Sequence, residues 1–349
     1  MRALIVGAGA VGQYLAARLR LGGHDVVLLA RPDGADSLRR EGITLRCGEQ
    51  EWPVSVGAAS EPDDRALAKP FELVIVAVKA YSTAGAIESL RAIRGCEGST
   101  ILTVQNGLGN EEALSAAFGA DRIAAGALTT AVDRSSATTV VASRGGGLSF
   151  APVGSAPHNW LIAATAHTGL EVRAAGDWRA LKWSKLCINL IANGTCAALD
   201  WTPAQVYRDV TAFAVERACL REAFETMRAL RIDVIGLVGF GVPLLAAAVR
   251  MLSPALLRAV MSGRVARARS EKLPSLLLDL RSRRPKVEAD ALYGAVAAHA
   301  GHVGRTAPAN FAIARVVNGI ADGSIEWSAF RGRPDALAEA AAISASGGT

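Results

Sequence analysis

The first 31 residues, "MRALIVGAGAVGQYLAARLRLGGHDVVLLAR", constrain the fold more than any other stretch of the chain. An apolar run at 2–6 predicts a strand, 11–21 predicts a helix, and "DVVLLA" predicts a second strand. Between the first strand and the helix, G-A-G-A-V-G has glycines where a dinucleotide-binding turn needs them, for the tight turn, the close pyrophosphate and the close helix–strand packing. The predicted cofactor contacts in this turn are Gly7, Ala8, Gly9, Ala10, Val11 and Gly12.

The residue that ends the second predicted strand indicates which cofactor is bound. An NAD-dependent protein usually has an acidic residue there to hold the ribose 2′-hydroxyl, whereas this chain has Arg31. A guanidinium suits a 2′-phosphate, and the carboxylate that would repel the phosphate is missing. The sequence therefore predicts NADP(H), although an arginine on a loop is also an ordinary surface residue.

Two further segments predict strands that end at the cofactor edge. "FELVIVAVKAY" is a continuous apolar run followed by Lys79, and "STILTVQNGLGNEEAL" leads into Asn106 before a predicted helix. Ligands of parallel sheets bind beyond the carboxyl ends of the strands, so both residues are candidates for cofactor contact. Taken alone, each is as readily explained by a turn or a solvated loop.

The pattern changes along the chain. From about 126 to 173 it is β-branched and glycine-punctuated, which predicts added strands, and from Trp178 it is helical almost to the end. We therefore expect an α/β N-terminal Rossmann-type domain (1–174), an all-α C-terminal domain (175–333) and a flexible tail (334–349), with a substrate cleft between the two domains.

The stretch "KLCINLIAN" places Lys185, Asn189 and Asn193 at every fourth position of an otherwise apolar helix. Each step of four residues advances about 40° around an α-helix, so the three side chains are predicted to share one stripe. Burying such groups without partners costs roughly 1–3 kcal/mol each. The stripe therefore faces either water or a ligand, and the residues alone leave both interpretations open.

Two more candidate residues lie in "LPSLLLDLRSRRPKVEADALYG". Ser275 precedes a run of leucines, and Glu288 begins a predicted helix after Pro285. A glutamate in a first helical turn ordinarily serves the helix itself, by capping it and opposing its dipole.

Composition and charge exclude several classes of protein. The net charge of +6 comes from basic residues spread along the chain, which does not predict nucleic-acid binding. The five scattered cysteines lack any CxxC, which predicts reduced thiols in a cytoplasmic protein and no metal site. The charge-free run at 234–249 is 16 residues long, short of the ~20 that span a bilayer, so we expect a buried helix pair or an interface rather than a membrane partner.

Together these segments resemble the ketopantoate reductase (2-dehydropantoate 2-reductase) family over nearly the full chain. The matching motifs are, in order, "GAGAVG", the arginine of "LLAR", "VAVKAY", "QNGLGNEE", "KWSKLCINLIANG" and "LPSLLLDLRSRRPKVEADALYGAV". The most specific is K-x-x-x-N-x-x-x-N downstream of a Rossmann domain and a Q-N-G turn. The resemblance implies an NADP-dependent oxidoreductase acting on CH–OH groups, of the kind used in pantothenate biosynthesis.

The family's functional residues correspond to residues of this chain. The family's lysine proton donor corresponds to Lys185, and its glutamate at the cofactor and substrate edge to Glu288. The resemblance further implies that Asn189, Asn193 and Ser275 bind substrate, that Asn106 contacts both cofactor and substrate, and that Lys79 lies near the cofactor phosphate.

The chain also departs from the family pattern. The last motif commonly reads E-x-D-x-L-N-G, and here Tyr293 replaces the asparagine. The expected function is NADPH-dependent reduction of a 2-oxo acid, 2-dehydropantoate to pantoate, as a divergent branch of the family. The alternatives are a reductase for another branched or bulky 2-oxo acid and a non-catalytic NADP(H)-binding sensor. A homodimer through the helical domain is one arrangement that the chain allows.

Overall fold

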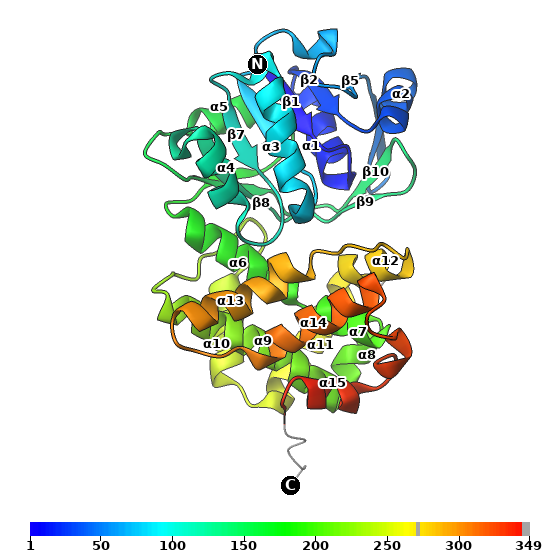
Figure 1. Ribbon diagram of the computed structural model, residues 1–349, viewed down its shortest axis with the longest axis vertical. Coiled ribbons are helices and arrows are strands. Elements are labelled where there is room, and N and C mark those ends of the chain that lie inside the picture. The colour runs from blue at the N-terminus through cyan, green and yellow to red at the C-terminus, as the bar shows by residue number, and fades with distance from the viewer. Residues whose placement is uncertain (270–272, 344–349) are drawn as a thin grey trace. The chain divides into compact units, whose positions relative to one another are not determined.

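The computed structural model describes residues 1–269 and 273–343, and the chain forms two compact units (Figure 1). Unit 1 holds most of the chain up to Lys182, and unit 2 holds most of the chain from Trp183 onward. Two short segments belong to the other unit: Asn106–Leu108 to unit 2 and Leu237–Phe240 to unit 1. The predicted boundary at residue 174 lies shortly before the point where the chain passes from one unit to the other.

Unit 1 is built on an eight-stranded sheet with the order β12-β11-β8-β7-β6-β1-β2-β5. All neighbouring strands are parallel except β8 and β11, which are antiparallel. The strands are β1 (Arg2–Val6), β2 (Asp25–Leu29), β5 (Gly57–Ala59), β6 (Leu73–Val76), β7 (Thr100–Thr103), β8 (Ile123–Leu128), β11 (Leu148–Pro152) and β12 (Val172–Ala174).

A smaller sheet of four strands, in the order β4-β3-β10-β9, completes the β structure. Its strands are β3 (Ile43–Cys47), β4 (Gln50–Val54), β9 (Val132–Arg134) and β10 (Thr139–Ala142). The strands predicted between 126 and 173 are therefore confirmed, and they contribute to both sheets.

Helices cover both faces of the main sheet because its central strands are apolar on both sides. Alternate residues of β1 enter two separate cores, Ile5 on one face and Leu4 on the other. The first core packs against α1 (Ala10–Leu21), α2 (Pro32–Glu41) and α5 (Trp160–Thr165), and the second against α3 (Thr83–Ala92) and α4 (Asn110–Phe118). This is the doubly covered parallel sheet predicted from the continuous apolar runs.

Unit 2 is helical, as predicted. Its longest helix, α9 (Val210–Ala229), packs against several others in the unit. The other helices described in unit 2 are α7 (Gly194–Leu199), α8 (Pro203–Arg208), α10 (Val242–Met251), α11 (Pro254–Arg269), α12 (Ser275–Arg281), the π-helix η5 (Asp290–Gly294), α13 (Ala295–His302), α14 (Pro308–Asp322), the 3-10 helix η6 (Trp327–Ala329) and α15 (Pro334–Ala340). The helix α6 (Trp178–Leu190) starts in unit 1 and ends in unit 2.

The structure corrects two expectations about this half of the chain in part. Of the two alternatives for the run at 234–249, the buried helix pair is wrong, because only its second half is helical, in α10, and Leu244 of that helix is 69% exposed. The other alternative, an interface, stays a prediction. The tail predicted over 334–349 begins instead with α15, which packs on α9 and buries Leu337, while its last part, 344–349, lies outside the described residues. The alanines of "PDALAEA" favour a helix as readily as a disordered tail, and the buried leucine holds it in place. Among the described residues, no helix is long and apolar enough to cross a membrane.

Candidate active site

The glycine-rich turn lies between β1 and α1 and has the backbone that the motif predicts. Gly7 has φ +107°, a conformation that L side chains rarely adopt, and a Cβ on Gly12 would lie 1.9 Å from the carbonyl oxygen of Gly7. Beside Gly9, where α1 begins, a Cβ would meet nothing within 4 Å. No side chain in the described chain caps α1, and its first turn has no acidic residue. The first N–H groups of α1 and the open space beside Gly9 therefore fit an anionic pyrophosphate.

The other predicted cofactor residues of unit 1 follow neighbouring strands. Arg31 follows β2 and is the exposed residue just before α2, and Lys79 follows β6. Because β6, β1 and β2 are adjacent and parallel, their carboxyl ends meet at one edge of the sheet. The structure thus brings the turn, Arg31 and Lys79 to the same edge, where dinucleotides bind in such sheets. Their contacts with a cofactor stay predictions.

In unit 2, α6 presents a narrow polar face from an otherwise buried helix. From Ala180 to Leu190 every side chain is buried except Lys185 and Asn189, which are partly exposed. These two residues are one helical turn apart, so they point to the same side. The predicted polar stripe therefore exists over this part of the helix.

Asn193 does not continue that stripe, because α6 ends at Leu190 and α7 begins at Gly194. Between them Ala192 has φ +50°, a left-handed conformation that breaks the helix. The expectation of one helix through all three residues was wrong at this point. Asn193 still reaches back, since its Nδ2 donates to the carbonyl oxygen of Asn189 at 3.1 Å.

Two buried side chains stabilise the break between α6 and α7. The Tyr293 hydroxyl accepts from the backbone N–H of Gly194 at 2.7 Å and donates to the carbonyl oxygen of Leu190 at 2.8 Å. The buried carboxylate of Glu216 accepts from the Ala192 N–H and from the Thr195 hydroxyl. Burial, with the Glu216 carboxylate nearby, raises the pKa of Tyr293 well above its ordinary value, so the phenol keeps its proton.

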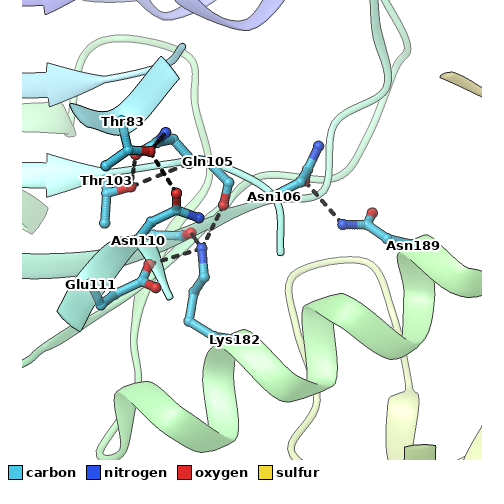
Figure 2. Close-up of polar contacts among 9 residues, drawn as sticks. Thr83, Thr103, Gln105, Asn106, Asn110, Glu111, Lys182 and Asn189 are labelled. Atoms are coloured by element: carbon cyan, nitrogen blue, oxygen red, sulfur yellow. Dashed lines mark hydrogen bonds and ion pairs between the residues drawn. The ribbon is translucent and has the colours of Figure 1, made fainter. Parts of the chain in front are cut away.

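The Q-N-G turn brings Asn106 to the polar face of α6. The Asn189 side chain donates to Oδ1 of Asn106 at 3.0 Å, as Figure 2 shows. The turn is also held on the π-helix η5, where the Leu108 N–H donates to the carbonyl oxygen of Ala291 at 3.1 Å. A Cβ on Gly107 would lie only 2.4 Å from that oxygen, so the glycine allows this close approach.

The remaining predicted residues lie in the same unit. Ser275 is the exposed first residue of α12, and the N–H of its neighbour Leu276 donates to Oδ1 of Asn193 at 3.1 Å. Glu288 is buried just before η5, and its backbone oxygen accepts from Leu292 N–H. Hydrogen bonds therefore connect Asn106, Asn189 and Asn193 to the start of the helix that carries Ser275.

The Asn193 amide is engaged with backbone on both sides, with Leu276 through its oxygen and Asn189 through its nitrogen. These two hydrogen bonds give Asn193 a structural role at the break between α6 and α7. Its predicted contact with the substrate stays a prediction.

The sequence interpretation missed one buried ion pair. The Lys182 ammonium lies 2.9 Å from Oε1 of Glu111, and the two side chains are 1% and 0% exposed. Burial raises the pKa of Glu111, and the Lys182 ammonium opposes that rise. The sequence could have singled out Lys182, which lies three positions before Lys185 on the same side of the apolar helix, but it gave no local sign of Glu111 as the partner. Across residues 1–269 and 273–343, no group of three His, Cys, Asp or Glu side chains is placed to hold a metal ion.

Comparison with known protein families assigns both halves of the chain. Residues 3–155 match the model described as "Ketopantoate reductase PanE/ApbA", and residues 177–321 match its C-terminal counterpart. A curated 2-dehydropantoate 2-reductase from Halobacterium salinarum is 29% identical over 209 residues, which cover 57% of this chain. The match spans 66% of that relative's own length.

Solved structures share the fold. A PanE/ApbA family ketopantoate reductase from Ralstonia eutropha is 25% identical with a TM-score of 0.77, over 93% of this chain and 99% of the other. A D-mandelate dehydrogenase, solved with NADH and anilino(oxo)acetate, has a TM-score of 0.77 at 18% identity. It covers 93% of this chain and 100% of its own. At that identity the second similarity concerns the fold alone.

The fold and its glycine-rich turn define an α/β protein of the dinucleotide-binding type. The two family matches are more specific. The chain belongs to the ketopantoate reductase (PanE/ApbA) family.

Replacing Tyr293 by phenylalanine tests the account of the α6–α7 break. The substitution keeps the ring but leaves the Gly194 N–H and the Leu190 carbonyl without their buried partner, so we expect a loss of about 1–3 kcal/mol in unfolding free energy. Urea denaturation measures it as a lower midpoint at an unchanged slope. Tyr81→Phe, at a site 44% exposed, is the control and should stay within about 0.5 kcal/mol. A Tyr293→Phe protein as stable as the parent would contradict the account.

Proposed function

We propose that this protein reduces the ketone of a 2-oxo acid with NADPH, with 2-dehydropantoate as the substrate that the family assignment favours. The observation that carries the proposal is the polar face of α6, where Lys185 and Asn189 alone interrupt a buried helix and Asn189 binds Asn106. A helix that only fills a core has no need of an amine and an amide on one side.

Each residue has a part in the proposed reaction. The nicotinamide cofactor, when bound, supplies the hydride that the ketone carbon receives. The ketone oxygen then needs a proton, and the Lys185 ammonium both stabilises the developing negative charge and gives that proton. The amides of Asn189 and Asn106 orient the substrate through its carboxylate and its oxygen, with Ser275 and Glu288 as the further predicted contacts.

Lys182 is the other lysine on this side of α6, and its surroundings do not suit a proton donor. It is 1% exposed, and its ammonium faces Glu111 Oε1 at 2.9 Å, the Gln105 carbonyl oxygen at 2.5 Å and the Gly126 carbonyl oxygen at 3.5 Å. Its ammonium is therefore enclosed by a carboxylate and two backbone carbonyls inside the protein. This comparison favours the partly exposed Lys185 as the donor.

The departure at Tyr293 does not argue for a different substrate. Tyr293 is fully buried, and its hydroxyl contacts two backbone groups at the α6–α7 break. A residue in that position supports the helix pair and has no exposed surface to offer a ligand. The identity of the 2-oxo acid therefore depends on other residues, and a branched or bulky 2-oxo acid other than 2-dehydropantoate is the alternative.

The cofactor preference is tested at Arg31. The parent protein should bind NADPH more tightly than NADH, and Arg31→Asp should weaken NADPH binding by roughly ten- to a hundred-fold, because a charge-assisted phosphate contact contributes about 1.5–3 kcal/mol. Fluorescence titration with both cofactors measures the ratio. Arg40→Asp, an exposed site on the same helix, makes the same charge change and should leave the ratio unaltered. Equal affinity of the parent protein for NADPH and NADH would contradict the assignment of Arg31 to the 2′-phosphate.

The proton donor is tested at Lys185. Lys185→Ala should lower turnover by ~10²–10⁴-fold while NADPH affinity and thermal stability change little. Asn189→Ala should act mainly on KM if its amide holds the substrate equally in the ground and transition states. Arg179→Ala, at the exposed second residue of α6, is the control and should leave turnover unchanged. Normal turnover by Lys185→Ala with the best 2-oxo acid would refute the assignment.

A further inference from the structure

The buried Lys182–Glu111 ion pair lies directly behind the turn that carries Asn106. The Lys182 ammonium donates to the carbonyl oxygen of Gln105, the residue before Asn106, at 2.5 Å (Figure 2). Glu111 belongs to α4, which begins at Asn110, just after the same turn. One ammonium thus holds the residue at which the turn starts and pairs with the helix into which the turn leads.

Hydrogen bonds hold the side chain of Gln105 as well as its backbone carbonyl group. It is buried, its amide nitrogen donates to the Thr83 hydroxyl at 2.8 Å, and its amide oxygen accepts from the Thr103 hydroxyl at 3.1 Å. The Thr83 hydroxyl lies 2.8 Å from Oδ1 of Asn110. This network explains why a glutamine precedes Asn106, since both polar groups of the buried Gln105 side chain bind residues beside the turn.

The same helix holds the turn at two consecutive residues. Lys182 and Asn189 are seven positions apart on α6, so they lie on one face, two turns from each other. Lys182 contacts the backbone of Gln105, and Asn189 contacts the side chain of Asn106. Figure 2 shows both side chains extending from α6 toward the turn. Lys185 lies between them in the sequence, so the residues that hold the turn and the proposed proton donor belong to the same helix.

We propose that Lys182 is a positioning residue, which, paired with Glu111, holds the Gln105 carbonyl so that the Asn106 amide meets Asn189 in the geometry needed for substrate. The inference rests on the proposed function, because its effect is read through turnover of the 2-oxo acid. It goes further by assigning a part to two buried charged residues that touch neither cofactor nor substrate.

The test separates positioning from stability with a double variant. Lys182→Met alone leaves the Glu111 carboxylate buried without its cation and is expected to destabilise the fold. Lys182→Met/Glu111→Leu replaces the ion pair by apolar side chains of similar size, a change that often preserves stability. We expect this double variant to fold and to bind NADPH within about threefold of the parent, while kcat/KM falls roughly 10- to 100-fold through a 1 Å-scale misplacement of Asn106. Arg179→Met, on the same helix but exposed, is the matched control and should change neither quantity.

A double-mutant cycle with Asn106→Ala shows whether Lys182 acts through that residue. In the Asn106→Ala background, loss of the ion pair should cost less than about threefold in kcat/KM, because the residue being positioned is gone. A stable double variant with kcat/KM within threefold of the parent, or an equal loss with and without Asn106, would overturn the inference.

If the double variant fails to fold, the single variant Glu111→Gln tests the inference instead. It removes the charge that pairs with Lys182, so kcat/KM should fall more than about threefold in the parent background but less than about threefold in the Asn106→Ala background, and an equal change in both backgrounds would overturn the inference. A parent protein that binds no NADPH or reduces no 2-oxo acid would instead refute the proposed function.

Discussion

Polar side chains on a buried helix need hydrogen-bond or ion-pair partners inside the protein. This requirement determines which segments pack against α6. Lys182 forms an ion pair with Glu111 and binds backbone carbonyls. The Ser184 hydroxyl accepts a hydrogen bond from the Ile235 N–H, and the Asn189 side chain donates one to Asn106. Each partner comes from a segment distant in the sequence. Leaving one such buried group unpaired costs about 1–3 kcal/mol, and more for a charge. The polar residues of α6 therefore fix which loops pack against it.

Much of this arrangement was predictable from the sequence because it depends on local patterns. The βαβ unit with its G-A-G-A-V-G turn, the continuous apolar strands and the helical second half are signals within short windows, and the structure confirms each of them. The carboxyl-end positions of Arg31 and Lys79 follow from the rule for parallel strands. These predictions needed no knowledge of which distant residues meet.

The predictions that were wrong depended on contacts between distant residues. The period of Lys185, Asn189 and Asn193 suggested one continuous helix, but Glu216 and Tyr293, which come later in the chain, stabilise a break at Ala192. We expected a flexible tail where α15 lies, because its own sequence does not reveal the two features that hold it, its packing on α9 and the burial of Leu337. Lys182 and Glu111 are 71 positions apart, and nothing local marks them as a pair (182 − 111 = 71).

Family membership and the polar face of α6 favour an enzyme over a cofactor sensor. A sensor needs the glycine-rich turn and the residues at the sheet edge, but it has no use for a partly exposed lysine and asparagine one turn apart on a buried helix. The most direct measurement is therefore the oxidation of NADPH by the purified protein with a panel of 2-oxo acids that includes 2-dehydropantoate, followed by the nicotinamide absorbance. The account predicts rapid oxidation that depends on the 2-oxo acid and is fastest with a branched one. Tight binding of NADPH with no oxidation by any member of the panel would contradict it.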